Sequence, residues 1–405
     1  MDPFNADSTQ QKRLFDFRRC LGIGGFGEVY LATMTSSGGV KTDVAVKVLH
    51  RNLDPSSQAV QRLRDEGRLL GILNHPSILR VNDLVVLDGH VSLVTEYVAG
   101  EDLDECLKAQ PPLSSRALLE VIGRVADALH SAYNSTPVDS KRPLHLIHRD
   151  VKPANIRIGR HGDVKLLDFG IAWATHRREA KTQTNAVIGS SLYMAPERLD
   201  DDGPAKPSSD VFSLGCVLYE GLAGKRFLGT MSLKQQFMMT RAPGEYETYK
   251  EKQLQKIPRK PEELIEVLTM LLDRDPSKRP AAIELSRFCD DLGDEMYGQS
   301  LRRWCQDRKW PRPPDIEDGG LTGRVISERI LPIMASDIET MRLNLKDVNL
   351  ERDSNEGDPQ PTDEEELSPE ETKRGWWLMV LTALIAAGLI VLFAIIFAGA
   401  VAIIW

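Results

Sequence analysis

The sequence predicts an α+β chain with a small strand-rich part, a larger helical part and one C-terminal transmembrane helix. Residues 14–98 hold short runs of apolar and β-branched residues, which is typical of strands. Beyond Gly100 the apolar residues recur with helical spacing. Residues 375–405 carry no charge and are mostly apolar, and a bilayer span needs only about 20 such residues.

The bulk composition argues for a folded chain without a nucleic-acid surface. The 405 residues suffice for about two or three domains. The net charge of −8 comes from residues 351–372, which hold ten acidic residues and one arginine, so the rest is nearly neutral. The five cysteines are scattered, odd in number and without C-x-x-C spacing, which argues against disulfides or zinc and favours reduced thiols in the cytosol.

The apolar pattern predicts individual elements. One helix is expected at 57–73 within the strand-rich part, because Leu63, Gly67, Leu70 and Leu73 fall on one stripe. The clearest helix of the second part has apolar residues along one face. The helices expected in the second part are 114–133, 208–223, 261–272 and 281–295. Residues 297–310 are expected to pack as a helical extension.

The two ends of the chain differ from its middle. Residues 1–13 are polar, which predicts a disordered leader and no signal peptide. Residues 311–374 are rich in Pro, Gly and acid, which predicts a juxtamembrane linker, disordered except for one helix near 335–345. We interpret its acidic run as a solvated spacer rather than a recognition element.

The span itself is placed at 376–405, since a buried helix of a soluble protein rarely stays apolar for so long. Lys373 and Arg374 precede it, which puts this flank on the cytoplasmic side. We therefore expect a single-pass membrane protein whose folded part is cytoplasmic.

Five short motifs occur in one order. A Gly-Ile-Gly-Gly-Phe-Gly-Glu-Val run is followed by Val-Ala-Val-Lys, then His-Arg-Asp-Val-Lys-Pro-Ala-Asn, Asp-Phe-Gly and Ala-Pro-Glu. They occupy residues 22–29, 44–47, 148–155, 168–170 and 195–197. A glycine run alone also fits a dinucleotide site, but this one lies between strands rather than before a helix. Together the motifs supply the parts that move a phosphoryl group from ATP to a hydroxyl.

This pattern resembles the eukaryotic-type protein kinase family, and within it the serine/threonine kinases. The resemblance covers residues 14–296 and implies the bilobal protein kinase fold. The small lobe would be residues 14–98, a five-stranded sheet with one helix, and the large helical lobe residues 99–296. A kinase followed by an acidic stretch and one span also resembles bacterial membrane-anchored kinases.

The resemblance implies an ATP site on the small lobe. The loop glycines lack side chains and can close over the phosphates. Lys47 would hold the first two phosphates and pair with Glu66. Thr95 would be the gatekeeper beside the hinge, whose backbone would bond adenine. The ATP-binding residues so implied are Gly22, Ile23, Gly24, Gly25, Phe26, Gly27, Val29, Ala45, Lys47, Glu66, Thr95, Glu96 and Val98.

The same resemblance assigns the catalytic residues. Asp150 would accept or orient the proton of the attacking hydroxyl, and Lys152 would balance the charge of the transferring phosphate. Lys152 in this motif is the mark of the serine/threonine type. Asn155 and Asp168 would bind Mg²⁺, with Mn²⁺ as an alternative ion, because an amide oxygen and a carboxylate suit a hard cation.

Regulation is expected in the activation loop, residues 168–197. Arg149 would contact a phosphorylated residue there, and we predict that Thr182 or Thr184 is autophosphorylated. Ser190 would hydrogen-bond to the catalytic Asp and Lys.

The resemblance also implies three structural roles. Glu197 and Arg279 would form a buried ion pair, and Asp210 would hold the catalytic loop backbone. His148 is expected to be a packed core histidine rather than an acid–base group.

The predicted function is therefore a membrane-tethered protein serine/threonine kinase that uses ATP and Mg²⁺. The alternative is a pseudokinase scaffold, which the intact catalytic positions disfavour. The expected partners are protein substrates with serine or threonine and the membrane, without nucleic acid. Homodimer formation, substrate identity and stimulus stay open.

Overall fold

The computed structural model describes residues 13–24, 27–49, 67, 70–137, 142–169, 191–199, 205–258, 261–312, 316 and 319–329. The chain divides into two compact units, Met1–Leu331 and Pro332–Trp405, and all described residues belong to the first. The described residues do not include four predicted segments: the leader up to residue 12, the helix near 335–345, the acidic run and the span at 376–405. Among the described residues no helix is long and apolar enough to cross a membrane.

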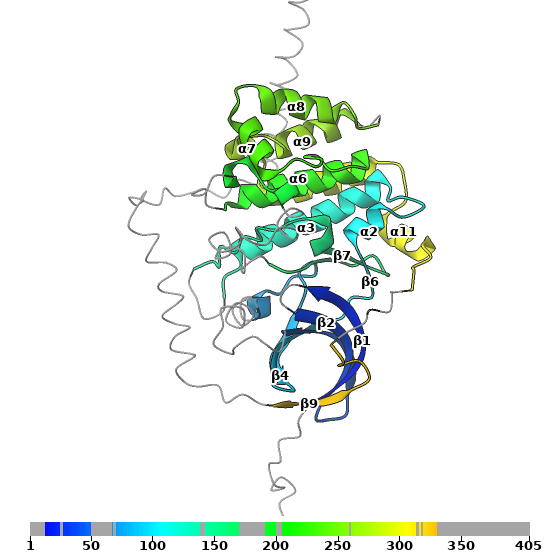
Figure 1. Cartoon of the computed structure of the whole chain (residues 1–405). Helices are drawn as coiled ribbons and strands as arrows, with labels where there is room; N and C mark the ends of the chain where they lie inside the picture. Colours follow the sequence, from blue (N-terminus) through cyan, green and yellow to red (C-terminus); the bar gives the residue numbers. More distant parts are fainter. Residues whose placement is uncertain are drawn as a thin grey trace, which may run out of the picture. The chain divides into compact units, whose positions relative to one another are not determined.

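The small lobe is a closed β-barrel, seen along its axis in Figure 1. Its strands follow one another around the barrel in the order β1-β2-β3-β5-β4-β9, all antiparallel to their neighbours. The strands are β1 (Leu14–Gly24), β2 (Gly27–Thr35), β3 (Lys41–Leu49), β4 (Val81–Leu87), β5 (His90–Glu96) and β9 (Val325–Arg329).

Alternation along the strands sorts side chains between the barrel interior and its outer surface. In β3, Val44, Val46 and Val48 are buried in the barrel core, whereas Ala45 and Lys47 between them are only partly buried. Successive side chains of a strand point to opposite faces, so this pattern leaves the alternate positions of β3 for a site outside the barrel.

The barrel differs from the five-stranded sheet that the resemblance implies, and the difference lies in β9. This strand comes from the segment predicted as a disordered linker, so that prediction is wrong for residues 325–329. It pairs with β1 on one side and β4 on the other. An open sheet would leave these two edges with unpaired backbone groups, and the sixth strand satisfies them.

The large lobe is mostly helical. The four helices expected there are confirmed to within one residue at each end, as α3 (Ser115–Asn134), α6 (Pro207–Ala223), α9 (Glu262–Leu271) and α10 (Ala282–Glu295). Two further helices, α7 (Leu233–Arg241) and α8 (Glu245–Leu254), were not expected, because their buried faces contain few apolar residues. The remaining elements are α2 (Leu103–Leu107), α11 (Leu301–Asp307) and a small sheet of β6 (Gly100–Asp102), β7 (Ile156–Gly159) and β8 (Val164–Leu166).

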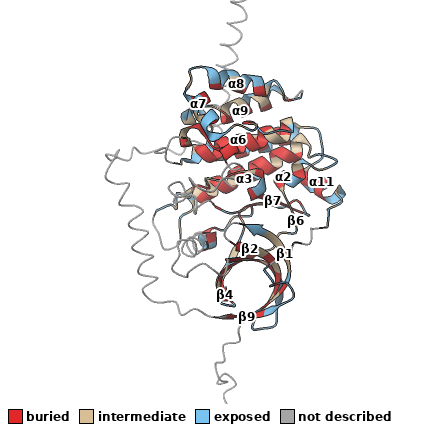
Figure 2. Cartoon of the chain, viewed as in Figure 1, coloured by how far each residue is buried: buried red, intermediate tan, exposed pale blue. Residues whose placement is uncertain are grey.

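Helices α3 and α6 form the centre of this lobe, and Figure 2 shows α6 as mostly buried and α3 as buried along one face. Ser114 caps α3 by accepting a hydrogen bond from the backbone N–H of Ala117. Where α10 crosses α3, a Cβ on Gly123 would lie only 2.9 Å from the Cβ of Cys289, so glycine permits the close approach of the two helices.

The C-terminal extension is anchored on the large lobe. Trp304 of α11 is buried, and its Nε1 donates to the carbonyl oxygen of Pro111 at 3.1 Å. The guanidinium of Arg308 lies over the rings of Trp304 and Trp310 and forms an ion pair with Glu101 beside the hinge. The extension therefore fixes the chain next to the connection between the lobes.

Candidate active site

The glycine-rich loop is the end of the β1–β2 hairpin. Pairing of the two strands continues through Gly22 and Ile23 to the Gly24–Gly27 pair. A Cβ on Gly27 would lie 2.1 Å from the carbonyl oxygen of Val48, so a larger residue cannot occupy this position without a backbone shift. Gly25 and Phe26 lie outside the described residues.

Four predicted ATP-site residues share the outer face of the barrel. Val29 is directly opposite Lys47, and Ala45 is directly opposite Thr95. Cross-strand partners project to the same side of a sheet, and residues 45 and 47 of one strand do so as well. The structure thus brings together an ammonium group and three small or apolar side chains, a surface that suits a purine base and its phosphates.

Lys47 also contacts the large lobe. Its Nζ lies 3.0 Å from Oδ1 of Asp168, which follows β8. Burial raises the pKa of Asp168, but the ammonium of Lys47, with smaller contributions from His148 and Lys152, outweighs burial and holds this pKa below its ordinary value. Asp168 is therefore a carboxylate at neutral pH. The predicted partner Glu66 lies outside the described residues.

The catalytic loop gathers two predicted residues around the carboxylate of a third. Oδ2 of Asp150 accepts hydrogen bonds from Nζ of Lys152 at 2.7 Å and from Nδ2 of Asn155 at 3.0 Å. The same amide nitrogen of Asn155 donates to the backbone carbonyl of Asp150 at 2.8 Å. Because both contacts use the amide nitrogen, the amide oxygen of Asn155 is the atom that can accept a cation.

A buried carboxylate holds this loop from behind. Asp210 at the start of α6 accepts hydrogen bonds from the backbone N–H groups of His148 at 2.7 Å and Arg149 at 2.8 Å. Arg149 has a φ of +70°, a strained conformation for a residue with a side chain, and Arg198 donates to its carbonyl at 2.6 Å. Burial raises the pKa of Asp210, although His148 and both N–H donors oppose this rise. The predicted role of Asp210 is confirmed.

His148 is a packed core residue, as expected. Its side chain is fully buried, its ring lies 4.7 Å from the ring of Phe169, and its Nε2 is 2.8 Å from the carbonyl oxygen of Leu167. It therefore packs against the Asp-Phe-Gly segment, as a structural residue would.

The hinge is held by two cations that sequence reasoning missed. Lys165 donates to the side chain of Glu96 at 2.6 Å, and Arg157 donates to the carbonyl of Val98 at 3.2 Å. Arg157 also forms an ion pair with Asp102 at 2.8 Å. Arg157 and Lys165 each lie between apolar residues, in β7 and β8 respectively. This alternation indicates a strand with one partly exposed face, but it does not indicate which group each cation binds.

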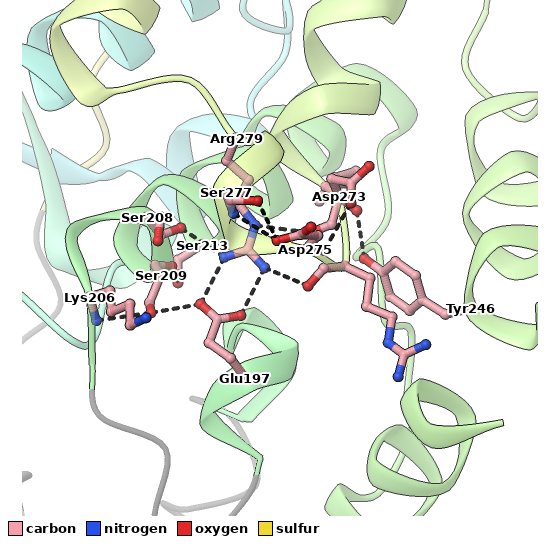
Figure 3. A network of polar contacts seen from close by, with 12 residues as sticks. Glu197, Lys206, Ser208, Ser209, Ser213, Tyr246, Asp273, Asp275, Ser277 and Arg279 are labelled. Carbon is pink, nitrogen blue, oxygen red and sulfur yellow. Dashed lines mark hydrogen bonds and ion pairs between the residues drawn. The ribbon is translucent and has the colours of Figure 1, made fainter. Parts of the chain in front are cut away.

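The activation loop is described only at its ends. Thr182, Thr184 and Ser190 lie outside the described residues, so their roles stay predictions. At the C-terminal end, Arg279 forms two parallel hydrogen bonds of 2.8 Å with the carboxylate of Glu197. The hydroxyl of Ser209 donates a further hydrogen bond to the same carboxylate (Figure 3). Burial raises the pKa of Glu197, and the hydrogen bonds from Arg279 outweigh it, so this pKa is lowered. The predicted buried pair is confirmed.

The metal ligands predicted here are Asn155 and Asp168. Within the described part of the chain, no group of three or more His, Cys, Asp and Glu residues could hold a metal ion by itself. An amide oxygen and a carboxylate nevertheless fit Mg²⁺, which keeps several waters and takes further ligands from phosphates.

Comparison with known proteins agrees with this geometry. The protein kinase domain family matches residues 15–288, and the chain belongs to that family. The serine/threonine-protein kinase PknB of Mycobacterium leprae is 38% identical over 209 residues, which are 51% of this chain and 32% of PknB. The serine/threonine-protein kinase PknA of Mycobacterium tuberculosis is 39% identical over 218 residues, 52% of this chain and 47% of PknA.

A third relative is named as a tyrosine kinase. The tyrosine-protein kinase MasK of Myxococcus xanthus is 35% identical over 212 residues, 51% of this chain and 32% of MasK. The chain thus matches between about a third and a half of the length of these relatives. The resemblance to eukaryotic-type serine/threonine kinases of bacteria, predicted from the motifs, is confirmed at the level of the family.

Proposed function

We propose that this chain transfers the terminal phosphoryl group of ATP to serine and threonine hydroxyls of protein substrates. The observation that carries the proposal is the arrangement around Asp150, whose carboxylate is held by Lys152 and Asn155 within hydrogen-bonding distance. A phosphoryl transfer has a loose transition state, so positioning of the attacking hydroxyl and of the charges matters more than basicity.

Each residue has a distinct task in this scheme. Asp150 orients the substrate hydroxyl and takes up its proton as the bond to phosphorus forms. Lys152, 2.7 Å from Asp150, places a positive charge where the transferred group carries negative charge. Lys47 binds phosphate oxygens from the small lobe. When bound, Mg²⁺ would be held by Asn155 and Asp168 and would neutralise charge on the phosphates.

The lysine of the Asp-Val-Lys-Pro motif favours serine and threonine over tyrosine as the acceptor. Its ammonium lies 2.7 Å from the carboxylate that would receive the proton of the hydroxyl. Tyrosine, the acceptor in the name of one relative, is the second candidate. Phosphoamino-acid analysis of a protein substrate after incubation with Mg-ATP separates the two: phosphoserine and phosphothreonine are expected, and phosphotyrosine alone would contradict the proposal.

We further propose that residues 376–405 anchor the chain in a membrane with the kinase domain in the cytoplasm. The support is the uncharged apolar run and the two basic residues before it. After cell breakage the full chain should stay in carbonate-washed membranes, and a chain ending at residue 331 should be released. Recovery of both in the soluble fraction would contradict the anchor.

Regulation by phosphorylation of Thr182 or Thr184 is the last part of the proposal. Arg149 lies next to Asp150 with its backbone held by Asp210, where a phosphorylated loop residue could pair with its guanidinium. Mass spectrometry of active protein should find phosphate on one of the two threonines. Active protein with neither modified would refute this part.

A further inference from the structure

The strand that closes the small-lobe barrel, β9, follows the helices of the large lobe in the sequence. Residues 319–329 begin 12 positions after the last residue of α11 and return to the small lobe. Since α11 is anchored on the large lobe, this return makes a second covalent connection between the lobes, in addition to the hinge near Val98. We call residues 319–329 the closing segment.

The closing segment is built into the barrel through its backbone. Phe15 pairs with Ile326, and Leu87 of β4 pairs with Glu328. Beyond the strand, the N–H of Phe17 donates to the carbonyl of Arg324 at 2.9 Å, and the N–H of Gly323 donates to the carbonyl of Phe17 at 2.7 Å. The ladder thus runs along the first half of β1, the strand that continues into the glycine-rich loop.

Its apolar side chains complete the barrel core. Ile326 is 8% exposed and Leu321 is buried, and both belong to the cluster that contains Phe15, Phe17 and Tyr30. Val325, next in the strand but on the opposite face, is 63% exposed. Without the closing segment, the phenylalanines of β1 would face an open side of the sheet, and burial of such side chains is the main force that fixes a strand.

A charged cluster fixes the end of the strand. The carboxylate of Glu328, a buried residue, accepts from Nε of Arg13 at 2.7 Å and from its backbone N–H at 3.0 Å. The guanidinium of Arg13 also pairs with Asp83. Arg13 therefore joins the closing segment to β4 at the start of β1.

The closing segment also contacts the residue that follows the last glycine of the glycine-rich loop. The N–H of Gly319 donates to a carboxylate oxygen of Glu28 at 3.1 Å, and the hydroxyl of Tyr30 donates to the same oxygen. Glu28 follows Gly27, the last glycine of the loop, and precedes Val29, which faces the ATP site. One carboxylate thus ties the closing segment to the part of β2 that carries the loop.

We propose that the closing segment is a positioning element for the glycine-rich loop, which sets the affinity for the triphosphate of ATP through Glu28 and through β1. The inference rests on the proposed use of ATP. A loop of glycines has little conformational preference of its own, so the strands on either side determine where its N–H groups lie. The closing segment restrains both strands: β1 by its ladder and β2 by the hydrogen bond to Glu28.

Two pairs of variants in the full chain test this proposal. Ile326→Ser removes an interior side chain of β9, and Val325→Ser is the matched control on the outer face. Glu28→Ala removes the acceptor for Gly319, and Glu28→Gln keeps an acceptor oxygen. For each, the KM for ATP and kcat are measured with a protein substrate, and the Kd of a fluorescent ATP analogue is measured without turnover.

Ile326→Ser and Glu28→Ala should raise the KM for ATP and the analogue Kd by about fivefold, while kcat at saturating ATP changes by less than about threefold. Val325→Ser and Glu28→Gln should stay within about twofold of the unchanged chain. A purely structural role would lower the folded fraction, and hence the apparent kcat, without raising KM or Kd, and that result would overturn the proposal.

The binding measurement separates this inference from the proposed function. If the unchanged chain binds the analogue but transfers no phosphate, the function fails while the Kd values still test the closing segment. If Ile326→Ser does not fold, the two Glu28 variants decide alone, because neither of them replaces an apolar side chain of the barrel core. Equal Kd values for Glu28→Ala and Glu28→Gln would then overturn the inference.

Discussion

Nζ of Lys47 lies 3.0 Å from Oδ1 of Asp168, although 121 positions separate the two residues in the sequence. The pair joins the outer face of the barrel to the segment that follows β8, and it brings the predicted phosphate-binding cation next to the predicted metal ligand. Both groups therefore meet where a metal-bound triphosphate would lie, which is the arrangement that phosphoryl transfer requires.

Replacement of Lys47 by methionine should remove the charge that binds the phosphates. We expect kcat/KM for ATP to fall by at least about 100-fold, because a fixed cation in a binding site stabilises the transferring charge by several kcal/mol. Lys41→Met, an exposed position at the start of the same strand, is the control and should change kcat/KM by less than about twofold. Equal kinetics for the two variants would contradict the assignment of Lys47.

Asp210→Asn should disturb the catalytic loop without removing a catalytic group. Both carboxylate oxygens accept a backbone N–H, and an amide side chain can accept only one of them through oxygen. One N–H is then left without an acceptor, which costs about 1–3 kcal/mol. Urea unfolding should report this loss, and kcat should fall by about tenfold or more because Asp150 is displaced. An unchanged kcat would show that Asp210 does not position the loop.

Arg279→Met should destabilise the large lobe strongly. The guanidinium is completely buried and forms two hydrogen bonds with Glu197, so its removal leaves a largely buried carboxylate without its cationic partner and with only the hydroxyl of Ser209 as a side-chain donor. Breaking such a pair costs about 3–5 kcal/mol.

The matched control is Arg303→Met, which breaks an exposed pair between Arg303 and Asp307 on α11. Exposed pairs of this kind contribute about 0–1 kcal/mol. Chemical denaturation of both variants gives the comparison. If Arg279→Met lowers the free energy of unfolding by as little as Arg303→Met does, the buried pair does not stabilise the fold.

The ion pair also predicts how stability depends on pH. Because Arg279 holds the pKa of Glu197 below its ordinary value of 4.5, the carboxylate stabilises the folded state above pH 4.5. This contribution is lost as the pH falls from 4.5 through the lowered pKa. The difference in unfolding free energy between the unchanged chain and Glu197→Gln should therefore shrink over this acid range. A difference that stays constant from pH 7 to the acid range would contradict the lowered pKa.

The cysteines should be unreactive in the folded protein. All five are buried free thiols, and burial raises the pKa of Cys106 to about 12 and that of Cys305 to about 11. Thiolates are the reactive form, so a thiol reagent at pH 8 should label the native protein slowly and the urea-unfolded protein at five sites. Rapid labelling of the native protein would show that a thiol is accessible.

The catalytic residues could be predicted from the sequence because their chemistry restricts the residue type at each position. Asp150, Lys152 and Asn155 lie within one stretch of six residues, so their contacts with one another are local in the sequence. The helices with an apolar stripe could be predicted for a similar reason, since the stripe is both the signal and the cause of burial.

The rest depends on contacts between distant segments. Strand β9 has only five residues beside glycines and acids, so its own pattern is too short to indicate a strand. It becomes one because the edges of β1 and β4 offer unpaired backbone groups. The hinge cations Arg157 and Lys165 were missed because neither residue type nor spacing says which carbonyl or carboxylate they reach.

Phosphoryl transfer by the Asp150→Asn variant tests the central claim most directly. The unchanged full chain and the variant are purified in parallel, and each is incubated with Mg-ATP labelled on the terminal phosphate and a protein substrate. The substitution keeps the size of the side chain and removes only the carboxylate that orients the hydroxyl. We predict label on substrate serine and threonine with the unchanged chain, and at least about 100-fold less with the variant at equal ATP binding. Equal incorporation by both proteins would contradict the account.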